Sequence, residues 1–133
     1  MDAQLRDRRL AVVRDHMEAE NRQDFDAVIA TFDRPRYELM ASAQVFDGEP
    51  EVRRYFTESR RVFPDQRNDN VVLRSADDVV VAEFDLLGTH RDSGRTFRSP
   101  MVALFVFEAE RIVCERVYFD RRSIEAQLAV QDG

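Results

Sequence analysis

The chain has 133 residues, 44% of them hydrophobic and 35% charged, a balance typical of globular rather than disordered proteins. The net charge of −6 argues against a nucleic-acid partner, because proteins that bind phosphates carry an excess of basic residues. A single cysteine, Cys114, excludes an intrachain disulfide, and no stretch reaches the roughly 18 apolar residues of a membrane span. The N-terminus also lacks the apolar run of a signal peptide. We therefore expect one cytoplasmic domain over residues 1–133, with no membrane partner.

The first half of the chain is predicted to be mainly helical. Apolar residues at helical spacing, among them Val13 and Met17, indicate a helix over Gln4–Asn21. Asp24 or Asp26 can cap a short second helix that ends before Pro35. The segment "YELMASAQVF", residues 37–46, alternates as one strand does, and Asp47–Gly48 forms its turn. A third helix begins at Pro50 and stops at Pro64.

The second half is predicted to be an antiparallel meander, because short turn-like links separate four strand-like segments. These segments are Arg67–Arg74, Val79–His90, Thr96–Glu108 and Arg111–Asp120. A final helix follows Asp120, with Ser123 as a candidate cap and Ile124, Leu128 and Val130 as its apolar residues. Helices gathered before an antiparallel sheet indicate the α+β class.

The strand Thr96–Glu108 is apolar on both of its faces. Phe97, Met101, Ala103, Phe105 and Phe107 share one face, and Val102, Leu104 and Val106 share the other. A sheet covered on one side only should alternate apolar with polar residues. We therefore expect the first face to form the core and the second to form a subunit interface, since large exposed apolar patches are rare on monomers.

The order and spacing of several motifs resemble the SnoaL-like branch of the nuclear transport factor 2-like superfamily. The motifs are "FDGEPEVRRYF", "FPD", "LLGTH", "FVFEAERIVCERVYFD" and "IEAQL", and the likeness runs from about Val12 to Leu128. The resemblance implies a curved antiparallel sheet wrapped around N-terminal helices, a cone with an internal cavity, and a homodimer formed through the outer face of the sheet. The family includes polyketide cyclases, which perform an intramolecular aldol closure, so the resemblance implies an activity of this kind. Other branches of the superfamily contain isomerases, dehydratases, epoxide hydrolases and proteins without catalysis.

The resemblance points to Asp120 and His90 as candidate catalytic residues. In the cyclases an aspartate at the end of the last long strand acts as acid and base, and Asp120 of "VYFD" occupies the matching place. A histidine at the end of "GTH" is a common neighbour, matched here by His90. The residues themselves leave a second interpretation open for each: Asp120 can cap the following helix, and His90 can lie in solvent at a hairpin end.

The last strand supplies two candidate substrate-binding residues. In a regular strand Ile112, Cys114, Arg116, Tyr118 and Asp120 share one face, and that face turns from apolar to polar along its length. We interpret the change as the point where the face leaves the core and enters a reaction cavity. Arg116 could hold an anionic group or form an ion pair with Glu83 or Asp85. Tyr118 could donate a hydrogen bond to a substrate or pack in the cavity wall.

Three further residues are candidates for lining the cavity. Tyr37 and Tyr55 could contact a substrate or belong to the core. His16 lies beside the Val13 and Met17 stripe, so it could reach the cavity or stay half-exposed on the helix.

We expect no metal site, because two distant histidines and one cysteine do not have metal-ligand spacing, and no cofactor motif is present. The hypothesis is a cofactor-independent enzyme that moves a proton next to a carbonyl in an apolar molecule, as an aldol-type cyclase, isomerase or dehydratase does. The alternative is a non-catalytic ligand-binding or dimerisation module of the same fold.

Overall fold

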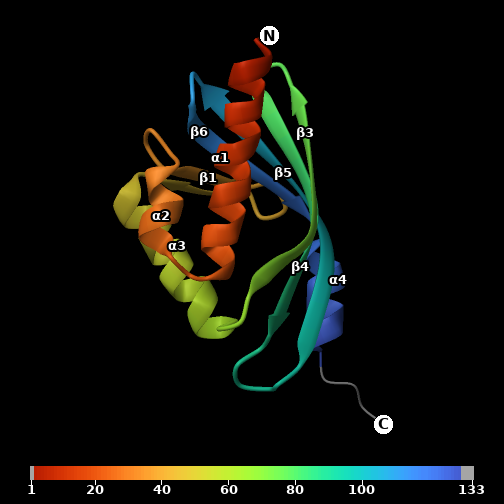
Figure 1. Cartoon of the computed structure of the whole chain (residues 1–133). Helices are drawn as coiled ribbons and strands as arrows, with labels where there is room; N and C mark the ends of the chain where they lie inside the picture. Colours follow the sequence, from red (N-terminus) through yellow and green to blue (C-terminus); the bar gives the residue numbers. More distant parts are fainter. Residues whose placement is uncertain (1, 130–133) are drawn as a thin grey trace.

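A computed structural model describes residues 2–129, and its secondary structure follows the predicted order of elements (Figure 1). The helices are α1 (Ala3–Asn21), α2 (Phe25–Ala30), α3 (Glu49–Val62) and α4 (Arg121–Leu128). The strands are β1 (Arg36–Leu39), β2 (Gln44–Asp47), β3 (Arg67–Ala76), β4 (Val79–Thr89), β5 (Thr96–Glu108) and β6 (Arg111–Phe119). The structure confirms the α+β class.

The six strands form one curved, unclosed sheet in the order β2-β1-β6-β5-β4-β3. The four strands of the second half pair antiparallel, as expected for a meander. The pairing of β1 with β6 is parallel, so the sheet is mixed rather than wholly antiparallel. Helix α1 crosses the inner, concave face beside β3, and α2 and α3 lie on the same side, so that the sheet wraps the N-terminal helices (Figure 1).

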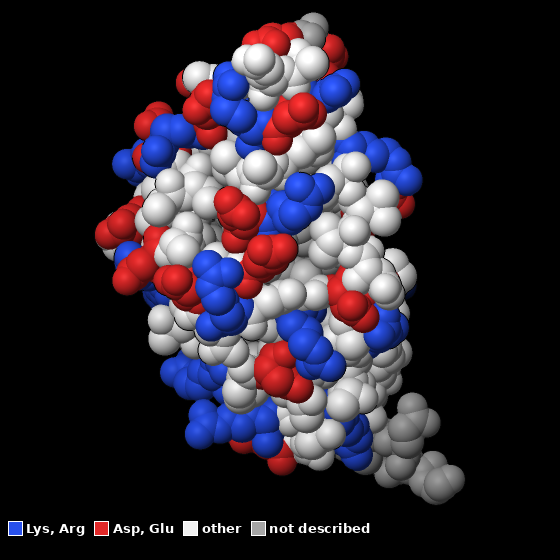
Figure 2. Space-filling model, viewed as in Figure 1, with Lys and Arg blue, Asp and Glu red and all other residues white. Residues whose placement is uncertain are grey.

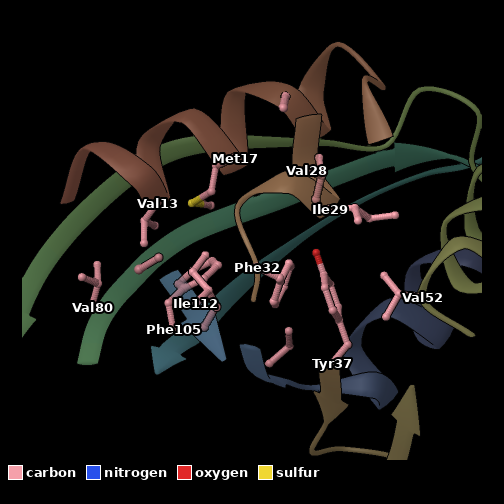
Figure 3. Packing of buried hydrophobic residues seen from close by; sticks show 14 of the residues in the cluster. Val13, Met17, Val28, Ile29, Phe32, Tyr37, Val52, Val80, Phe105 and Ile112 are labelled. Carbon is pink, nitrogen blue, oxygen red and sulfur yellow. The ribbon is translucent and has the colours of Figure 1, made fainter. Parts of the chain in front are cut away.

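The core fills the space between the concave face and these helices (Figure 3). Val13 of α1, Val28 of α2 and Val52 of α3 are fully buried, and they meet Val80 and Phe105 of the sheet layer. Each such side chain stabilises the fold by about 1.5–3 kcal/mol relative to exposure. On the surface, acidic and basic side chains are interspersed over the helical face (Figure 2).

The segment at residues 37–46 forms two strands rather than the single strand that its alternation predicted. β1 and β2 form an antiparallel hairpin, in which Tyr37 pairs with Phe46 and Leu39 with Gln44. The turn between them includes Ala43, whose φ of 56° is left-handed. The sequence did not indicate this turn, because the turn contains no glycine, proline or Asn-Gly pair.

Strand β6 contains a bulge that the sequence did not reveal. Val106 pairs with Cys114, whereas Phe107 pairs with Ile112, which leaves Val113 without a partner on β5. One inserted residue reverses the inward and outward alternation for the rest of a strand.

Because of the bulge, the residues of β6 that point inward differ from those expected from the sequence. Ile112 points into the core, but beyond Val113 the inward residues are Glu115 and Val117, at 5% and 7% exposure. Arg116 and Tyr118 therefore lie on the outer face of the sheet instead of in the cavity.

Helix α4 begins directly after Asp120, which is its N-cap. An oxygen of the Asp120 carboxylate accepts hydrogen bonds from the backbone N–H groups of Arg122 and Ser123, at 3.1 and 3.3 Å. Of the two candidate caps, Asp120 is therefore the cap, and Ser123 lies inside the helix. The helix packs against β5, and Gln127 exchanges two hydrogen bonds with the backbone of Arg98. Val130 lies outside the described residues.

Candidate functional site

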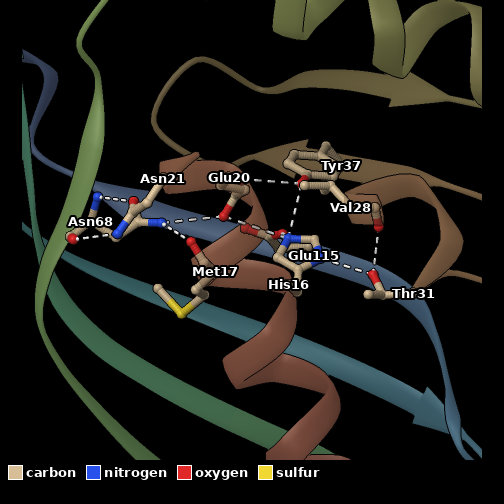
Figure 4. Close-up of polar contacts among 9 residues, drawn as sticks. All are labelled: His16, Met17, Glu20, Asn21, Val28, Thr31, Tyr37, Asn68 and Glu115. Carbon is tan, nitrogen blue, oxygen red and sulfur yellow. Dashed lines mark hydrogen bonds and ion pairs between the residues drawn. The ribbon is translucent and has the colours of Figure 1, made fainter. Parts of the chain in front are cut away.

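A polar cluster lies inside the otherwise apolar core, and His16 of α1 is its centre (Figure 4). The side chain is fully buried, and its ring makes edge-on contacts with Phe32 and Phe105. His16 Nδ1 lies 2.9 Å from the Thr31 hydroxyl, which gives its own proton to the carbonyl of Val28 at 2.6 Å. Since that proton is engaged, Nδ1 must be the donor to Thr31. The neutral ring therefore has a free lone pair on Nε2.

His16 Nε2 faces three polar groups at once. The Tyr37 hydroxyl lies 3.1 Å away, an oxygen of Glu115 lies 3.0 Å away and an oxygen of Glu20 lies 3.6 Å away. The contact with Glu115 Oε1 has the distance of an ion pair, but this buried oxygen has no aligned hydrogen-bond donor. A proton on Nε2 would therefore be shared between an imidazole, a phenol and two carboxylates.

Glu20 is the part of the cluster nearest to solvent, with 13% of its side chain exposed. Asn68 of β3 donates to one carboxylate oxygen at 3.3 Å, and the Tyr37 hydroxyl donates to the other at 3.4 Å. Burial raises the pKa of Glu20, and although the positive charge of His16 opposes this, the balance leaves the pKa above its usual value. Burial therefore favours the neutral acid form of Glu20 more than water does for an exposed carboxyl group.

The environment also shifts the other titratable groups of the cluster. Burial lowers the pKa of His16, but the charges of Glu20 and Glu115 outweigh burial, so that the pKa is raised. Burial raises the pKa of Tyr37 well above its usual value, and the two carboxylates raise it further. Tyr37 therefore keeps its proton and remains a hydrogen-bond donor.

A small interior cavity lies next to this cluster, with a volume of about 30 Å³. It is lined by Met17, Glu20, Tyr37, Tyr55, Gln66, Asn68, Phe84, Leu86, Met101, Glu115 and Val117. A water molecule needs about 10–15 Å³ by this measure, so the cavity has room for one or two waters. Tyr55, Gln66 and Asn68 are half-buried, and they mark the side on which the cavity approaches solvent.

The structure brings together three of the residues proposed from the sequence as substrate-binding. Tyr37 and Tyr55 both line the cavity, with their ring centroids 5.5 Å apart. His16 touches Tyr37 directly, and it is fully buried rather than half-exposed.

Asp120 and His90, the candidate catalytic residues, have separate local partners in the structure. Asp120 is exposed and caps α4, as described above. His90 follows β4 at a hairpin turn, where its Nδ1 accepts from the backbone N–H of Ser93 and lies 2.8 Å from the Ser93 hydroxyl. Each side chain accepts hydrogen bonds from backbone N–H groups close to it in the sequence, and neither side chain lines the cavity.

Arg116 and Tyr118 also lie away from the cavity, because of the bulge in β6. Arg116 binds Glu38 on the neighbouring strand β1 at 2.9 Å, rather than Glu83 or Asp85. This hydrogen bond, with a second from Arg36, lowers the pKa of Glu38. Tyr118 is 42% exposed on the outer face, so the expectation that its face of the strand enters the interior cavity is wrong.

The sequence interpretation missed Glu20 and Glu115. Glu20 carried a usable signal, because it follows Val13, His16 and Met17 at helical spacing on the same stripe of α1. Glu115 carried none, since an uninterrupted strand would place it on the outer face. Only the bulge at Val113 turns it inward.

His16, Glu20 and Glu115 together offer one nitrogen and two oxygens that lie within 4.8 Å of one another. Such a set can share protons or hold a cation. No local pattern indicated this set of three residues, because its members come from two segments about 100 residues apart along the chain.

Comparison with known proteins identifies the family. The family model described as the SnoaL-like domain matches residues 13–115. The chain belongs to the SnoaL-like family. The matched region includes His16, Glu20, Tyr37 and Glu115, so the buried cluster lies within the family domain. No curated protein matches the sequence. Among the described residues, no helix has the length and apolar character that a membrane crossing requires.

Solved structures show the same fold at low sequence identity. A protein of Xanthomonas campestris called a polyketide cyclase has a TM-score of 0.85 at 21% identity, over 93% of this chain and 98% of that one. A Catenulispora acidiphila protein with a ketosteroid isomerase-like fold, in complex with trimethylamine, has a TM-score of 0.80 at 19% identity, over 87% and 90% of the two chains. A phenazine biosynthesis-related protein of Pseudomonas aeruginosa has a TM-score of 0.79 at 16% identity, over 98% and 90%.

Proposed function

We propose that this SnoaL-like protein is a cofactor-independent enzyme that transfers a proton at a carbon next to a carbonyl group, as aldol-type cyclases, isomerases and dehydratases do. The observation that carries the proposal is the buried cluster of His16, Glu20, Tyr37 and Glu115 against an interior cavity. Buried titratable groups are costly, and they concentrate where chemistry needs them.

The geometry assigns separate roles to Glu20 and Tyr37. Glu20 lines the cavity, so its carboxylate can take the proton from carbon and its neutral form can return it. The Tyr37 hydroxyl points into the same space and can donate to the oxygen on which enolate charge develops. His16 lies behind these two groups, where its Nε2 holds the phenol in place and its positive charge balances that of Glu20. Glu115 lies 3.0 Å from His16 Nε2 on the far side.

Substrate binding requires the cavity to widen, because about 30 Å³ is far below the volume of any carbonyl compound. The half-buried side chains of Tyr55, Gln66 and Asn68 are the ones that must move. Of the second candidate function, a non-catalytic ligand-binding or dimerisation module, the same small volume favours the dimerisation form, in which the polar cluster is structural.

Hydrogen–deuterium exchange at the α-carbon of simple ketones in D₂O tests the proposal without knowledge of the natural substrate. We expect the wild-type protein to accelerate exchange of cyclohexanone or acetophenone, as followed by proton NMR. Glu20→Gln keeps the shape and removes the base, so the acceleration should fall by about 10²–10⁴, the usual contribution of general acid–base catalysis.

Glu18→Gln is the matched control, since Glu18 lies on the same helix and is exposed. It should leave exchange unchanged. Full exchange activity in Glu20→Gln would remove Glu20 from the mechanism. A wild-type protein that binds the ketones without accelerating exchange would favour the non-catalytic module.

A further inference from the structure

We propose that His16, Glu20 and Glu115 also form a binding site for one divalent first-row transition-metal ion, with Zn²⁺ as the best-suited member. The site would use His16 Nε2 and one oxygen from each carboxylate, three atoms that lie within 4.8 Å of one another. The proposal rests on the positions and chemistry of these atoms, and it does not depend on the reaction proposed above.

The distances suit a small cation. Zinc bonds to nitrogen and oxygen are about 2.0–2.2 Å long, so two donors on a tetrahedral zinc ion lie about 3.3 Å apart. His16 Nε2 is 3.0 Å from the nearest oxygen of Glu115 and 3.6 Å from that of Glu20. Small side-chain rotations would bring all three donors to bonding distance of one ion. A nitrogen and two carboxylate oxygens are also ligands that zinc and its neighbours accept.

Glu115 supplies a second and independent indication of a ligand. The side chain is 6% exposed, and its Oε1 is buried without any hydrogen-bond donor. A buried polar atom left unsatisfied costs about 1–3 kcal/mol, and more when it is charged. A cation between Glu115 and Glu20 would satisfy this oxygen.

The surroundings have the features of an outer coordination shell. His16 donates from Nδ1 to Thr31, which fixes the tautomer that leaves Nε2 free as a ligand, and Asn68 donates to Glu20. On the remaining side lie the Tyr37 hydroxyl, 3.1 Å from Nε2, and the cavity of about 30 Å³. The fourth position of the ion would therefore be open to a water molecule, with Tyr37 as its hydrogen-bond partner.

A bound metal and the proposed proton transfer exclude each other, because the ion would take the Nε2 lone pair and the carboxylate oxygens that move protons. Where the proposed function holds, the metal acts as an inhibitor of the same site. The binding experiment is separate from the activity experiment, so either proposal can fail without the other.

Cobalt(II) is the probe, since its visible absorption reports the number and geometry of its ligands. Metal-free protein is titrated with Co²⁺, followed by displacement with Zn²⁺. We expect one Co²⁺ per chain in the wild-type protein, in the variant His90→Gln and in the variant Glu18→Gln. His90 is the only other histidine of the chain, so it controls for adventitious binding.

The ligand variants His16→Gln and Glu20→Gln should weaken binding by more than the roughly 10–100-fold that loss of an outer-shell partner costs, and should change or abolish the cobalt spectrum. Glu20→Gln preserves volume at a site near the surface, and circular dichroism checks that each variant folds. Wild-type protein that takes up no Co²⁺ or Zn²⁺ would overturn the proposal. So would binding that survives in both ligand variants.

Discussion

At the scale of single residues, Asp120 shows how one side chain can fit two interpretations that only its surroundings separate. Its place at the end of the last strand matches an acid–base aspartate, and its place before a helix matches an N-cap. The structure gives its carboxylate two backbone N–H donors and an exposed position, so its observed contacts are those of a cap. Glu20, the base that we propose, lies instead in the interior against the cavity.

Substitutions at Asp120 should therefore affect stability rather than catalysis. Asp120→Asn should be nearly silent in urea unfolding, because asparagine caps helices as well as aspartate does. Asp120→Ala should lower the free energy of unfolding by about 1 kcal/mol. Both variants should keep the ketone exchange activity of the wild type. A large loss of exchange in Asp120→Asn, with stability unchanged, would return Asp120 to the active site.

At the scale of elements, the bulge in β6 decides which side chains enter the cone. Without Val113 as an extra residue, Arg116 and Tyr118 would point into the core and Glu115 would lie outside. With Val113 as an extra residue, Glu115 contacts His16 in the interior, and Arg116 binds Glu38 on the outer face. Bulges are common next to functional sites because they redirect side chains in this way.

A pair of neighbouring substitutions tests the alternation beyond the bulge. Val117→Ser leaves a hydroxyl and a void in the core, so it should cost about 2–3 kcal/mol in urea unfolding. Arg116→Ser removes an ion pair between half-exposed groups, which contributes only about 0–1 kcal/mol. Equal losses, or a larger loss for Arg116→Ser, would contradict the inward position of Val117.

At the scale of the whole molecule, the outer face of the sheet carries apolar side chains in solvent. Val45, Val72, Val102 and Tyr118 are between 36% and 48% exposed, and they come from four different strands of the sheet. We propose that this face forms a homodimer interface, because covering it with a second copy would remove these side chains from water.

A charge placed on this face should dissociate the dimer. Light scattering should give twice the chain mass for the wild-type protein at micromolar concentration, and the chain mass for Val102→Asp. Val62→Asp is the control, because Val62 is similarly exposed, at 39%, but belongs to helix α3 and not to a strand of the outer face. A monomeric wild type, or a Val102→Asp variant that remains dimeric, would exclude the interface.

The sequence by itself determined the elements and the main layers of the protein. Apolar residues at helical spacing predicted α1, and Pro64 predicted where α3 ends, because these are effects of neighbouring residues along the chain. Helix α2 ends at Ala30, earlier than Pro35 requires. The inward face of β5, from Phe97 to Phe107, followed from strict alternation in a strand without a bulge. The order and spacing of the sequence motifs, through their resemblance to the SnoaL-like family, predicted this fold.

Tertiary structure alone decided which polar groups meet inside that fold. Glu115 reaches His16 because one unpaired residue shifts the register of β6, and Tyr37 reaches both because β1 pairs in parallel with β6. Neither pairing has a signal in local sequence, since strand register depends on the competing partners of the whole sheet. The site is built from α1, β1 and β6, whose contacts span most of the chain. For that reason the sequence predicted the cone, and only the folded chain showed which acids lie within it.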